Sequence, residues 1–319
     1  MIDLLEYNMG LEDVWNSVLR NSRNGTFLLN RGFMDYHKDL FVDCSLIFRK
    51  GKQMVGLFPA NYDESCNSIY SHQGLTYGGL ILTTTATATD VLEMFELMKA
   101  HYKIKYGANT IYYKPIPHIY HQYPCEEDLY CLFRNDAELV CRSISSAVKL
   151  DEAIGFSTLR RRKIRRAVRE KVKVGLSSSS SDVGRFWNLL SETLESRHSV
   201  KPVHSVGEME LLMQRFPDEI KLLLCEDNDG ELLAGIWLFC CGRVAHTQYL
   251  ASSAQGREIG ALDYLISKLV NDIKDDKTEF FDFGISTENG GMVLNEGLIF
   301  QKEGFGGRGV CYDTYKFKV

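Results

Sequence analysis

The same order of predicted elements occurs twice along this chain of 319 residues. In each half, hydrophobic periodicity predicts two helices, then antiparallel strands joined by tight turns, then a further helix and strand. The predicted helices cover residues 11–22, 32–37, 89–101, 183–195, 206–216, 259–273 and 290–302. This repetition predicts a tandem duplication of one α/β (α+β) unit, whose mixed, mostly antiparallel sheet is flanked by helices.

The length agrees with two domains, because a single hydrophobic core stops growing at about 250–300 residues. We place the boundary so that residues 1–150 form an N-terminal domain and residues 151–319 a C-terminal domain. An antiparallel meander followed by a helix and a strand differs from a doubly wound nucleotide-binding fold. Neither G-x-G-x-x-G after a first strand nor G-x-x-x-x-G-K-[ST] occurs, which excludes dinucleotide and Walker-type ATP sites.

The chain is expected to be cytoplasmic and to lack a membrane span and a metal. Its acidic start, MIDLLEYNMGLEDVW, has no basic n-region, and its longest apolar run, Ile236–Cys241, is far shorter than the roughly 18 residues that span a bilayer. The nine cysteines form no C-x-x-C pair, so we expect reduced thiols and no zinc site. His118 and His121 are not expected to converge on a metal, because Pro115 and Pro117 break a helix there.

Charge is concentrated in one segment. Residues 160–173 contain nine Arg or Lys and one Glu, a local charge of +8, while the remaining 28 basic and 41 acidic residues leave −13. Such a segment indicates an anionic partner such as tRNA, although it is also typical of a solvated helix face with a thin apolar stripe. Both interpretations stay open, and the acidic remainder argues against a protein that coats duplex DNA.

Several short strings are distributed over nearly the whole chain. They are His72–Leu80 (HQGLTYGGL), Lys201–Glu208 (KPVHSVGE), His246–Ser252 (HTQYLAS), Phe281–Ser286 (FDFGIS), Leu294–Leu298 (LNEGL) and Gln301–Gly307 (QKEGFGG). In their order and spacing they resemble the GNAT (Gcn5-related N-acetyltransferase) superfamily, specifically its FemAB-like branch of tandem-domain acyltransferases.

The resemblance implies two GNAT-like domains and N-acyl transfer from acetyl-CoA or another acyl-CoA. The acceptor would be an amine on a small anionic molecule, such as an amino sugar nucleotide or a cell-wall precursor. The donor site is expected in the C-terminal domain or in a groove between the domains. Fem-type relatives use aminoacyl-tRNA instead, which would give residues 160–173 a role, but this chain lacks their long helical hairpin. A non-catalytic GNAT-like binding module is the third alternative, and the oligomeric state is left open.

The resemblance also directs attention to one loop. GNAT enzymes hold the CoA pyrophosphate on the backbone amides of a [QR]-x-x-G-x-[GA] segment that opens a helix. The best match begins at Arg257 and has Leu262 where a small residue is expected. The residues expected to bind the donor are Arg257, Glu258, Ile259, Gly260 and Ala261.

Acyl transfer needs a base, hydrogen-bond donors for the oxyanion and a proton for the leaving group. The candidate bases are His204 and Glu208. His246 alternates with Gln248 along a strand, so both are expected on one face, either lining a cleft or forming a buried pair. Asp282 lies between two phenylalanines, and a buried carboxylate must be paired. We expect Asp282 to orient His246, to cap the following turn or to act in catalysis.

The remaining candidates would bind substrate. The glycine pair after Tyr77 permits close approach of the backbone to a ligand, or forms a simple turn. Asn295 and Lys302 are seven residues apart and so share a helix face. The substrate-binding candidates are Tyr77, Gly78, Gly79, Lys114, Gln248, Tyr249, Asn295 and Lys302.

Overall fold

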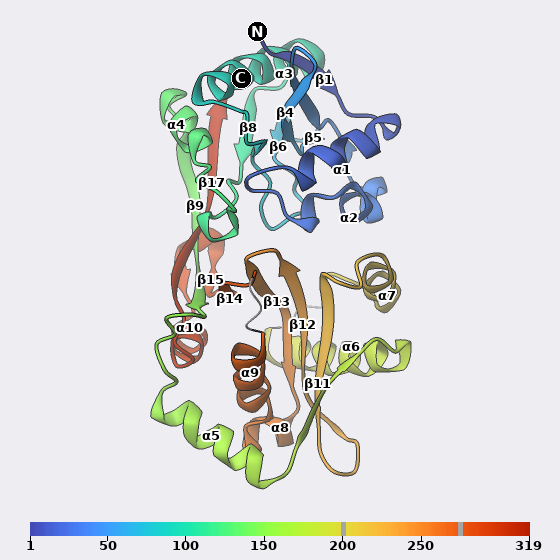
Figure 1. Ribbon diagram of the computed structural model, residues 1–319, viewed down its shortest axis with the longest axis vertical. Helices are drawn as coiled ribbons and strands as arrows, with labels where there is room; N and C mark the ends of the chain where they lie inside the picture. Colours follow the sequence, from blue (N-terminus) through green and yellow to red (C-terminus); the bar gives the residue numbers. More distant parts are fainter. Residues whose placement is uncertain (199–201, 274–276) are drawn as a thin grey trace. The chain divides into compact units, whose positions relative to one another are not determined.

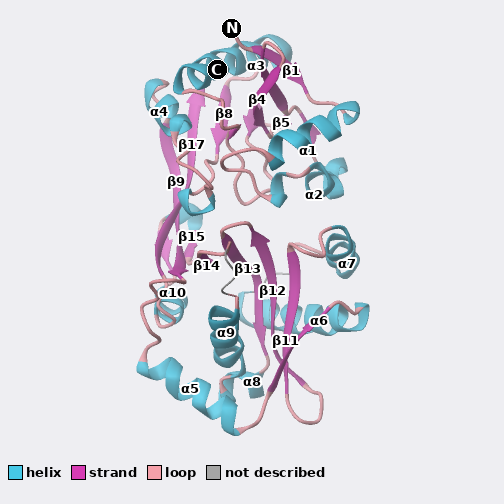
Figure 2. Ribbon diagram, in the orientation of Figure 1, coloured by secondary structure: helices cyan, strands magenta, loops and turns pink. Residues whose placement is uncertain are grey.

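The computed structural model describes residues 1–198, 202–273 and 277–319 and divides the chain into two compact units (Figures 1 and 2). Lys201, which begins one of the strings named above, lies outside the described residues. Unit 1 contains Met1–Ile144, Thr287–Leu294 and Val310–Val319, and unit 2 contains Ser145–Ser286 and Asn295–Gly309. The division after Ile144 lies close to the boundary that the sequence predicts at residue 150.

Unit 1 also takes in two late segments of the chain, an arrangement that the simple division into 1–150 and 151–319 does not include. The physical reason is strand pairing. Strand β17 (Arg308–Lys318) pairs antiparallel with β8 (Thr110–Tyr113), with Phe317 opposite Ile111. The two-residue strands β15 (Thr287–Glu288) and β16 (Val293–Leu294) form a small hairpin that also belongs to unit 1.

The strands of unit 1 form two groups. The first is wholly antiparallel and has the order β1-β3-β4-β7 (Asp3–Glu6, Leu46–Lys50, Gln53–Phe58, Ile81–Leu82). In the second, β2 (Val42–Asp43), β5 (Asn61–Asp63) and β6 (Ser68–Tyr70) are antiparallel, and β6 then pairs in parallel with β8. Its α-helices are α1 (Glu12–Arg20), α2 (Arg31–Met34), α3 (Ala88–Tyr106) and α4 (Glu127–Arg134).

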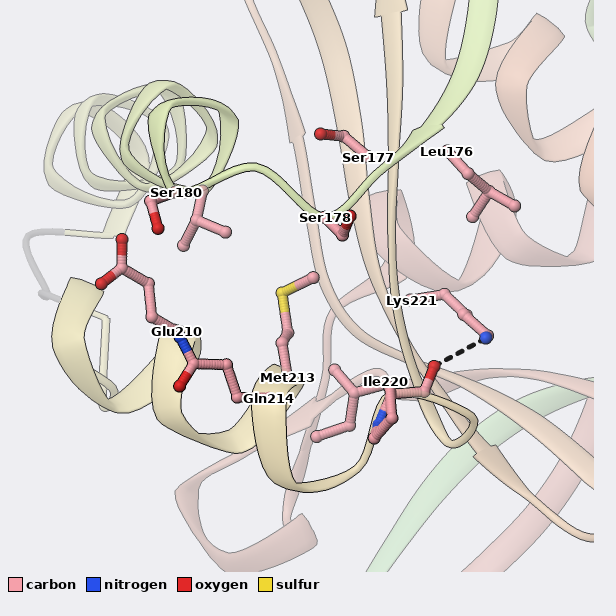
Figure 3. Close-up of a pocket in the computed structure, with 11 residues that line it drawn as sticks. Leu176, Ser177, Ser178, Ser180, Glu210, Met213, Gln214, Ile220 and Lys221 are labelled. Carbon is pink, nitrogen blue, oxygen red and sulfur yellow. Dashed lines mark hydrogen bonds between the residues drawn. The ribbon is translucent and has the colours of Figure 1, made fainter.

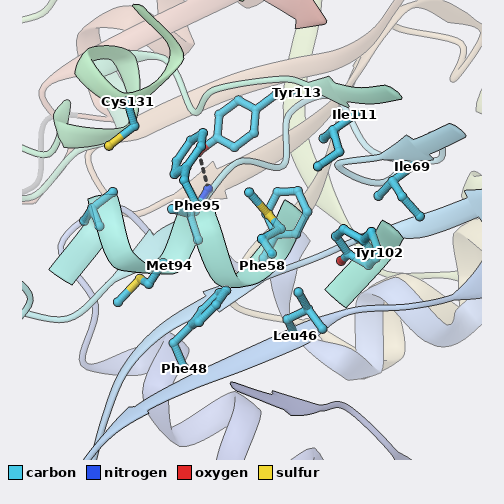
Figure 4. Packing of buried hydrophobic residues seen from close by; sticks show 14 of the residues in the cluster. Leu46, Phe48, Phe58, Ile69, Met94, Phe95, Tyr102, Ile111, Tyr113 and Cys131 are labelled. Carbon is cyan, nitrogen blue, oxygen red and sulfur yellow. Dashed lines mark hydrogen bonds between the residues drawn. The ribbon is translucent and has the colours of Figure 1, made fainter. Parts of the chain in front are cut away.

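Helix α3 provides the centre of the unit 1 core. A capping box between Thr87 and Asp90 begins the helix, and Gly107, with a φ of 62°, ends it. Met94 and Phe95 are fully buried on its inner face, among residues from the strands (Figure 4). The helix is thus placed by its caps and held by burial of one apolar face.

Unit 2 is built on a sheet in which β10 (Lys173–Ser177), β11 (Ile220–Glu226), β12 (Leu232–Cys241) and β13 (Val244–Ser252) are antiparallel neighbours. Strand β14 (Phe280–Ile285) pairs in parallel with β13 and antiparallel with β9 (Glu138–Lys149). The helices are α5 (Thr158–Arg169), α6 (Ser180–His198), α7 (Val206–Arg215), α8 (Ala254–Ile259), α9 (Ala261–Asp272) and α10 (Glu296–Glu303).

The predicted fold class is confirmed, since each unit combines a mixed, mostly antiparallel sheet with flanking helices. Two predicted helices differ in their limits. The helix expected over 259–273 is interrupted at Gly260, whose φ of 85° ends α8 and begins α9. The helix expected over 290–302 begins only at Glu296, because Gly290 and Gly291 have positive φ and the Asn295 side chain caps the first turn.

The structure also bears on the membrane question. Among residues 1–198, 202–273 and 277–319, no helix combines the length and the apolar character needed to cross a bilayer.

Candidate functional site

A histidine and an aspartate from neighbouring strands of unit 2 form a hydrogen-bonded pair. His246 on β13 and Asp282 on β14 are register partners, and His246 Nδ1 lies 2.9 Å from Asp282 Oδ2. Asp282 is fully buried, whereas the His246 side chain retains a tenth of its surface exposed. A carboxylate at Nδ1 makes that nitrogen the protonated one and leaves Nε2 with a lone pair for a substrate proton. The sequence expectation that Asp282 orients His246 agrees with this geometry.

The pair lies where two parallel strands separate. Strands β13 and β14 pair over Val244–His246 and Phe280–Asp282, after which β13 continues to Ser252 paired with β12 but not with β14. Just beyond, the β12–β13 register shifts so that Trp237 faces Tyr249 and Leu238 faces Thr247, which makes Gln248 the extra residue of a bulge. A bulge leaves backbone groups outside the ladder and re-aims side chains. The predicted alternation, in which His246 and Gln248 point to the same face of the strand, is therefore interrupted at Gln248, next to the point where β14 separates from β13.

A buried lysine contacts the end of β14. The Lys302 ammonium on α10 donates to the carbonyl oxygens of Gly284 (2.8 Å) and Ile285 (2.7 Å). Burial lowers the pKa of Lys302 to about 8, and the nearby negative charge of Asp282 acts in the opposite direction. Lys302 thus places a second proton-carrying group beside Asp282. Asn295, predicted on the same helix face, caps α10 by accepting from the Leu298 amide.

A second polar pair lies further along β13. His204 Nδ1 and the Tyr249 hydroxyl are 2.7 Å apart, and the Tyr249 ring stacks on Trp237 with an interplanar angle of 7°. Burial raises the pKa of Tyr249, which therefore keeps its proton near neutral pH. Glu208, the other candidate base, bonds through its carboxylate to the amide and hydroxyl of Ser205 in the capping box of α7.

The segment expected to hold a CoA pyrophosphate has no open loop. Residues 254–259 are helical, and Arg257 Nη1 donates to the Ser252 carbonyl. The Gly260 backbone lies directly against α5, since a Cβ at this glycine would be 2.7 Å from the Lys163 carbonyl oxygen. The remaining members, Ile259 and Ala261, are apolar and buried.

Two carboxylates flank this segment. Asp263, in the first turn of α9, is buried and paired with Arg160 at 2.7 Å. The Glu258 carboxylate pairs with Arg166 at 2.7 Å. Each carboxylate near the N-terminal end of α9 is thus paired with an arginine of α5.

Helix α5 presents most of the basic segment to solvent. Ser157 caps its first turn, and Ala167 is buried on its inner face. Arg160 is buried against Asp263 and the ring of Phe305, so this cation is structural. The exposed cations of residues 160–173 are Arg161, Arg162, Arg165, Arg169, Lys171 and Lys173.

The candidates in unit 1 have structural partners. The Tyr77 hydroxyl bonds to Thr26 at 3.0 Å, and its ring packs on Tyr120 inside the core. The Lys114 ammonium donates to the Leu75 carbonyl, and burial lowers the pKa of Lys114 to about 8. A Cβ at Gly78 would be 2.0 Å from the Ser71 carbonyl oxygen. Gly79, with a φ of 36°, lies against Tyr113.

One cavity of unit 2 lies apart from the His246–Asp282 pair. It has a volume of about 370 Å³ and lies between the end of β10, the start of α6, α7 and β11 (Figure 3). Seryl hydroxyls, Glu210 and Lys221 line it together with apolar side chains, and Lys221 donates to the Pro217 carbonyl at 2.7 Å. Sequence reasoning did not identify this cavity, because its walls come from four separate elements.

In the described part of the chain, no three His, Cys, Asp or Glu side chains gather as the ligands of a metal ion would. Ser145 is a site residue that sequence reasoning missed. Its hydroxyl donates to Asp282 Oδ1, and as one of three serines in residues 143–146 it carried no signal that could have distinguished it.

Comparison with known proteins shows a matching domain family and similar folds. Residues 158–289 match the family model described as an acetyltransferase (GNAT) domain. The whole chain superposes on FemX with a TM-score of 0.72 at 11% identity, covering 99% of this chain and 97% of that one. L-PGS from Bacillus licheniformis gives 0.61 at 12% identity, covering 98% and 92% of the two chains. No curated protein sequence matches the chain.

A tandem GNAT protein from the clavulanic acid biosynthesis pathway superposes with a TM-score of 0.52 at 8% identity, covering 100% of this chain and 98% of that one. Residues 158–289 thus match a GNAT acetyltransferase domain, and the fold of the chain is similar to that of FemX and L-PGS.

Proposed function

We propose that this protein transfers an acyl group to an amine at the opening between β13 and β14, with His246 as the general base. The observation that carries the proposal is the bond between His246 Nδ1 and the buried Asp282, which directs Nε2 away from the carboxylate. A correctly placed base contributes about 10²–10⁴-fold to such reactions.

The reaction needs no covalent enzyme intermediate. The acceptor nitrogen attacks the acyl carbonyl carbon, a C–N bond forms, and the bond from carbon to the leaving oxygen or sulfur breaks. His246 Nε2 takes the proton from the attacking nitrogen. The bulge at Gln248 offers a backbone amide outside the ladder for the oxyanion. Tyr249, which keeps its proton, would protonate the leaving group.

Aminoacyl-tRNA is the donor that the geometry supports best. The segment Arg257–Ala261 is helical up to Ile259 and packed against α5 at Gly260, and the amides of Arg257 and Gly260 already donate to backbone carbonyls, so it offers poor conditions for a pyrophosphate. Helix α5 instead exposes a row of arginines, and phosphate contacts dominate the affinity of proteins for nucleic acids. The fold shared with FemX supports the same choice.

Acyl-CoA is the second candidate donor. It is favoured by the match of residues 158–289 to an acetyltransferase domain and by the separation of β13 from β14. With either donor, we propose as acceptor an amine on a small anionic molecule of the cell-envelope precursor type. Two substrate-binding candidates lie beside the His246–Asp282 pair. Lys302 contacts the end of β14, and Gln248 lies two residues after His246 on β13.

Ligand-dependent stability tests the donor directly. The full chain is heated with CoA, with acetyl-CoA and with bulk tRNA in separate titrations. A ligand at 100 times its Kd that binds only the folded state adds about 2.7 kcal/mol, which is visible as a rise in melting temperature. We expect a response to tRNA. A rise in melting temperature with acetyl-CoA alone would identify acyl-CoA as the donor instead. No rise with any of these ligands would favour a binding module without transferase activity.

A transfer assay then tests the activity. The chain is incubated with bulk tRNA charged with labelled amino acids and with a pool of amine acceptors. We expect label to move into an acid-stable amide, and no movement with any charged tRNA or acyl-CoA would contradict the proposal.

A further inference from the structure

The Asp282 carboxylate has partners on both of its oxygens. Oδ2 accepts from His246, and Oδ1 accepts from the hydroxyl of Ser145 on β9 and, at 3.3 Å, from the backbone amide of Gly284. Asp282 and Ser145 are both fully buried. A carboxylate bonded at both oxygens has little freedom to rotate, so the atom that faces His246 is determined by the donors on the other side.

The backbone of β14 is shaped for this arrangement. On the β9–β14 ladder, Asp282 faces Ala147 and Ile285 faces Ser145, so β14 has one more residue than β9 between these two pairs. Gly284, with a φ of 76°, lies in this irregular stretch. The local bend brings the Gly284 amide back onto Asp282 and lets a serine that is not its direct register partner reach the same oxygen.

The neighbouring residue, Ser146, is buried like Ser145 and provides a comparison for it. Ser146 is as buried as Ser145, yet its hydroxyl has no hydrogen-bond partner within the described chain. Ser146 remains buried without a partner even though burying an unpaired hydroxyl costs free energy. The bond between Ser145 and Asp282 is therefore not a consequence of burial alone. The two neighbouring serines therefore form a natural matched pair, in which only one contacts the site.

We infer that Ser145 is a positioning residue, whose hydroxyl holds Asp282 so that Oδ2 keeps the His246 ring in the orientation that presents Nε2 to substrate. The kinetic consequence rests on the proposed function. The hydrogen-bonded arrangement does not, and it can be measured without any substrate.

The spectroscopic test compares Ser145→Ala with Ser146→Ala in the full-length chain. Imidazole ¹⁵N–¹H spectra report the tautomer of each of the eight histidines and the exchange of its ring proton, and His246→Gln assigns the His246 signal. We expect a single, slowly exchanging Nδ1–H tautomer in the parent chain and in Ser146→Ala. In Ser145→Ala that proton should exchange at least threefold faster. Identical spectra for the two serine variants would overturn the inference.

The kinetic test uses the donor found in the titrations above. Ser145→Ala should lower kcat at least fivefold with KM within twofold, whereas Ser146→Ala should stay within twofold of the parent for both. If Ser145→Ala does not fold, Ser145→Cys keeps a weak donor of similar size and should give intermediate values. A lower kcat with an unchanged His246 signal would contradict a positioning role. Faster proton exchange in Ser145→Ala in a chain that transfers no acyl group would support the positioning role and refute only the proposed function.

Discussion

Asp282 and His246 face each other on the last paired rung between β14 and β13, with Oδ2 and Nδ1 2.9 Å apart. Beyond this rung β13 continues without β14, and the bulge at Gln248 follows within two residues. The proposed base, its buried aspartate partner and the stretch of β13 that lacks β14 are therefore brought together by strand register. This relationship is the physical basis for placing the reaction here rather than in unit 1.

The first prediction concerns the base. His246→Gln should lower kcat by about 10²–10⁴-fold, because the glutamine cannot accept the amine proton, and Asp282→Asn should lower it as well by disturbing the imidazole. Steady-state transfer assays measure both effects. His118→Gln, at an exposed position in unit 1, is the matched control and should behave as the parent. If His246→Gln kept most of the activity, His204 would become the candidate base.

The second prediction concerns the basic face of α5. Replacing Arg161, Arg165 and Arg169 together with alanine should weaken tRNA binding and flatten its dependence on salt, because fewer counterions are released on binding. Filter binding over a range of salt concentrations provides the measurement. As control, the variant with alanine at the exposed lysines 38, 52 and 103 of unit 1 removes the same charge. Equal losses in the two variants would show that only net charge matters.

The third prediction separates a buried ion pair from an exposed one on the same helix. Asp263→Ala leaves the Arg160 guanidinium buried without its partner and should lower the free energy of unfolding by about 3–5 kcal/mol. Glu258→Ala removes the exposed partner of Arg166 and should cost less than ~1 kcal/mol. Urea denaturation of both variants gives the comparison. Similar values for the two would mean that the Arg160–Asp263 pair is better solvated than its burial indicates.

The fourth prediction concerns acid stability. Burial lowers the pKa of His72 from its ordinary value of 6.5 to about 3. Between these values the unfolded chain binds a proton that the folded chain does not. The contribution of neutral His72 to the free energy of unfolding is therefore fully present above pH 6.5. It is lost as the pH falls toward 3, by an amount on the order of several kcal/mol.

Replacement of His72 by asparagine should reduce this loss. Asparagine does not titrate and tolerates the left-handed backbone at this position, where φ is 62°. Unfolding free energies measured at several pH values should fall less for His72→Asn than for the parent between pH 7 and pH 4, so that the difference between them shifts in favour of the variant. Parallel pH profiles would contradict the assignment.

Much of the organisation followed from sequence patterns. The repeated order of elements and the strings resembling GNAT proteins predicted the two-unit architecture, because periodicity and turn residues act over short distances. The same patterns selected His246 and Asp282, since polar residues inside otherwise apolar strands are costly unless they are used. Helix limits were less well predicted at Gly260 and Asn295, where a positive φ and a side-chain cap decided the boundary.

The tertiary structure alone decided which candidates meet. Glu208 was a candidate base by sequence, but a local capping box takes its carboxylate. Ser145 was one serine among several until the irregular pairing of β9 with β14 brought its hydroxyl to Asp282. Arg257–Ala261 matched a phosphate-binding pattern, and the structure makes residues 254–259 helical and packs Gly260 against α5. Sequence determines what each residue can do, whereas register and packing between distant segments determine which atoms come within bonding distance.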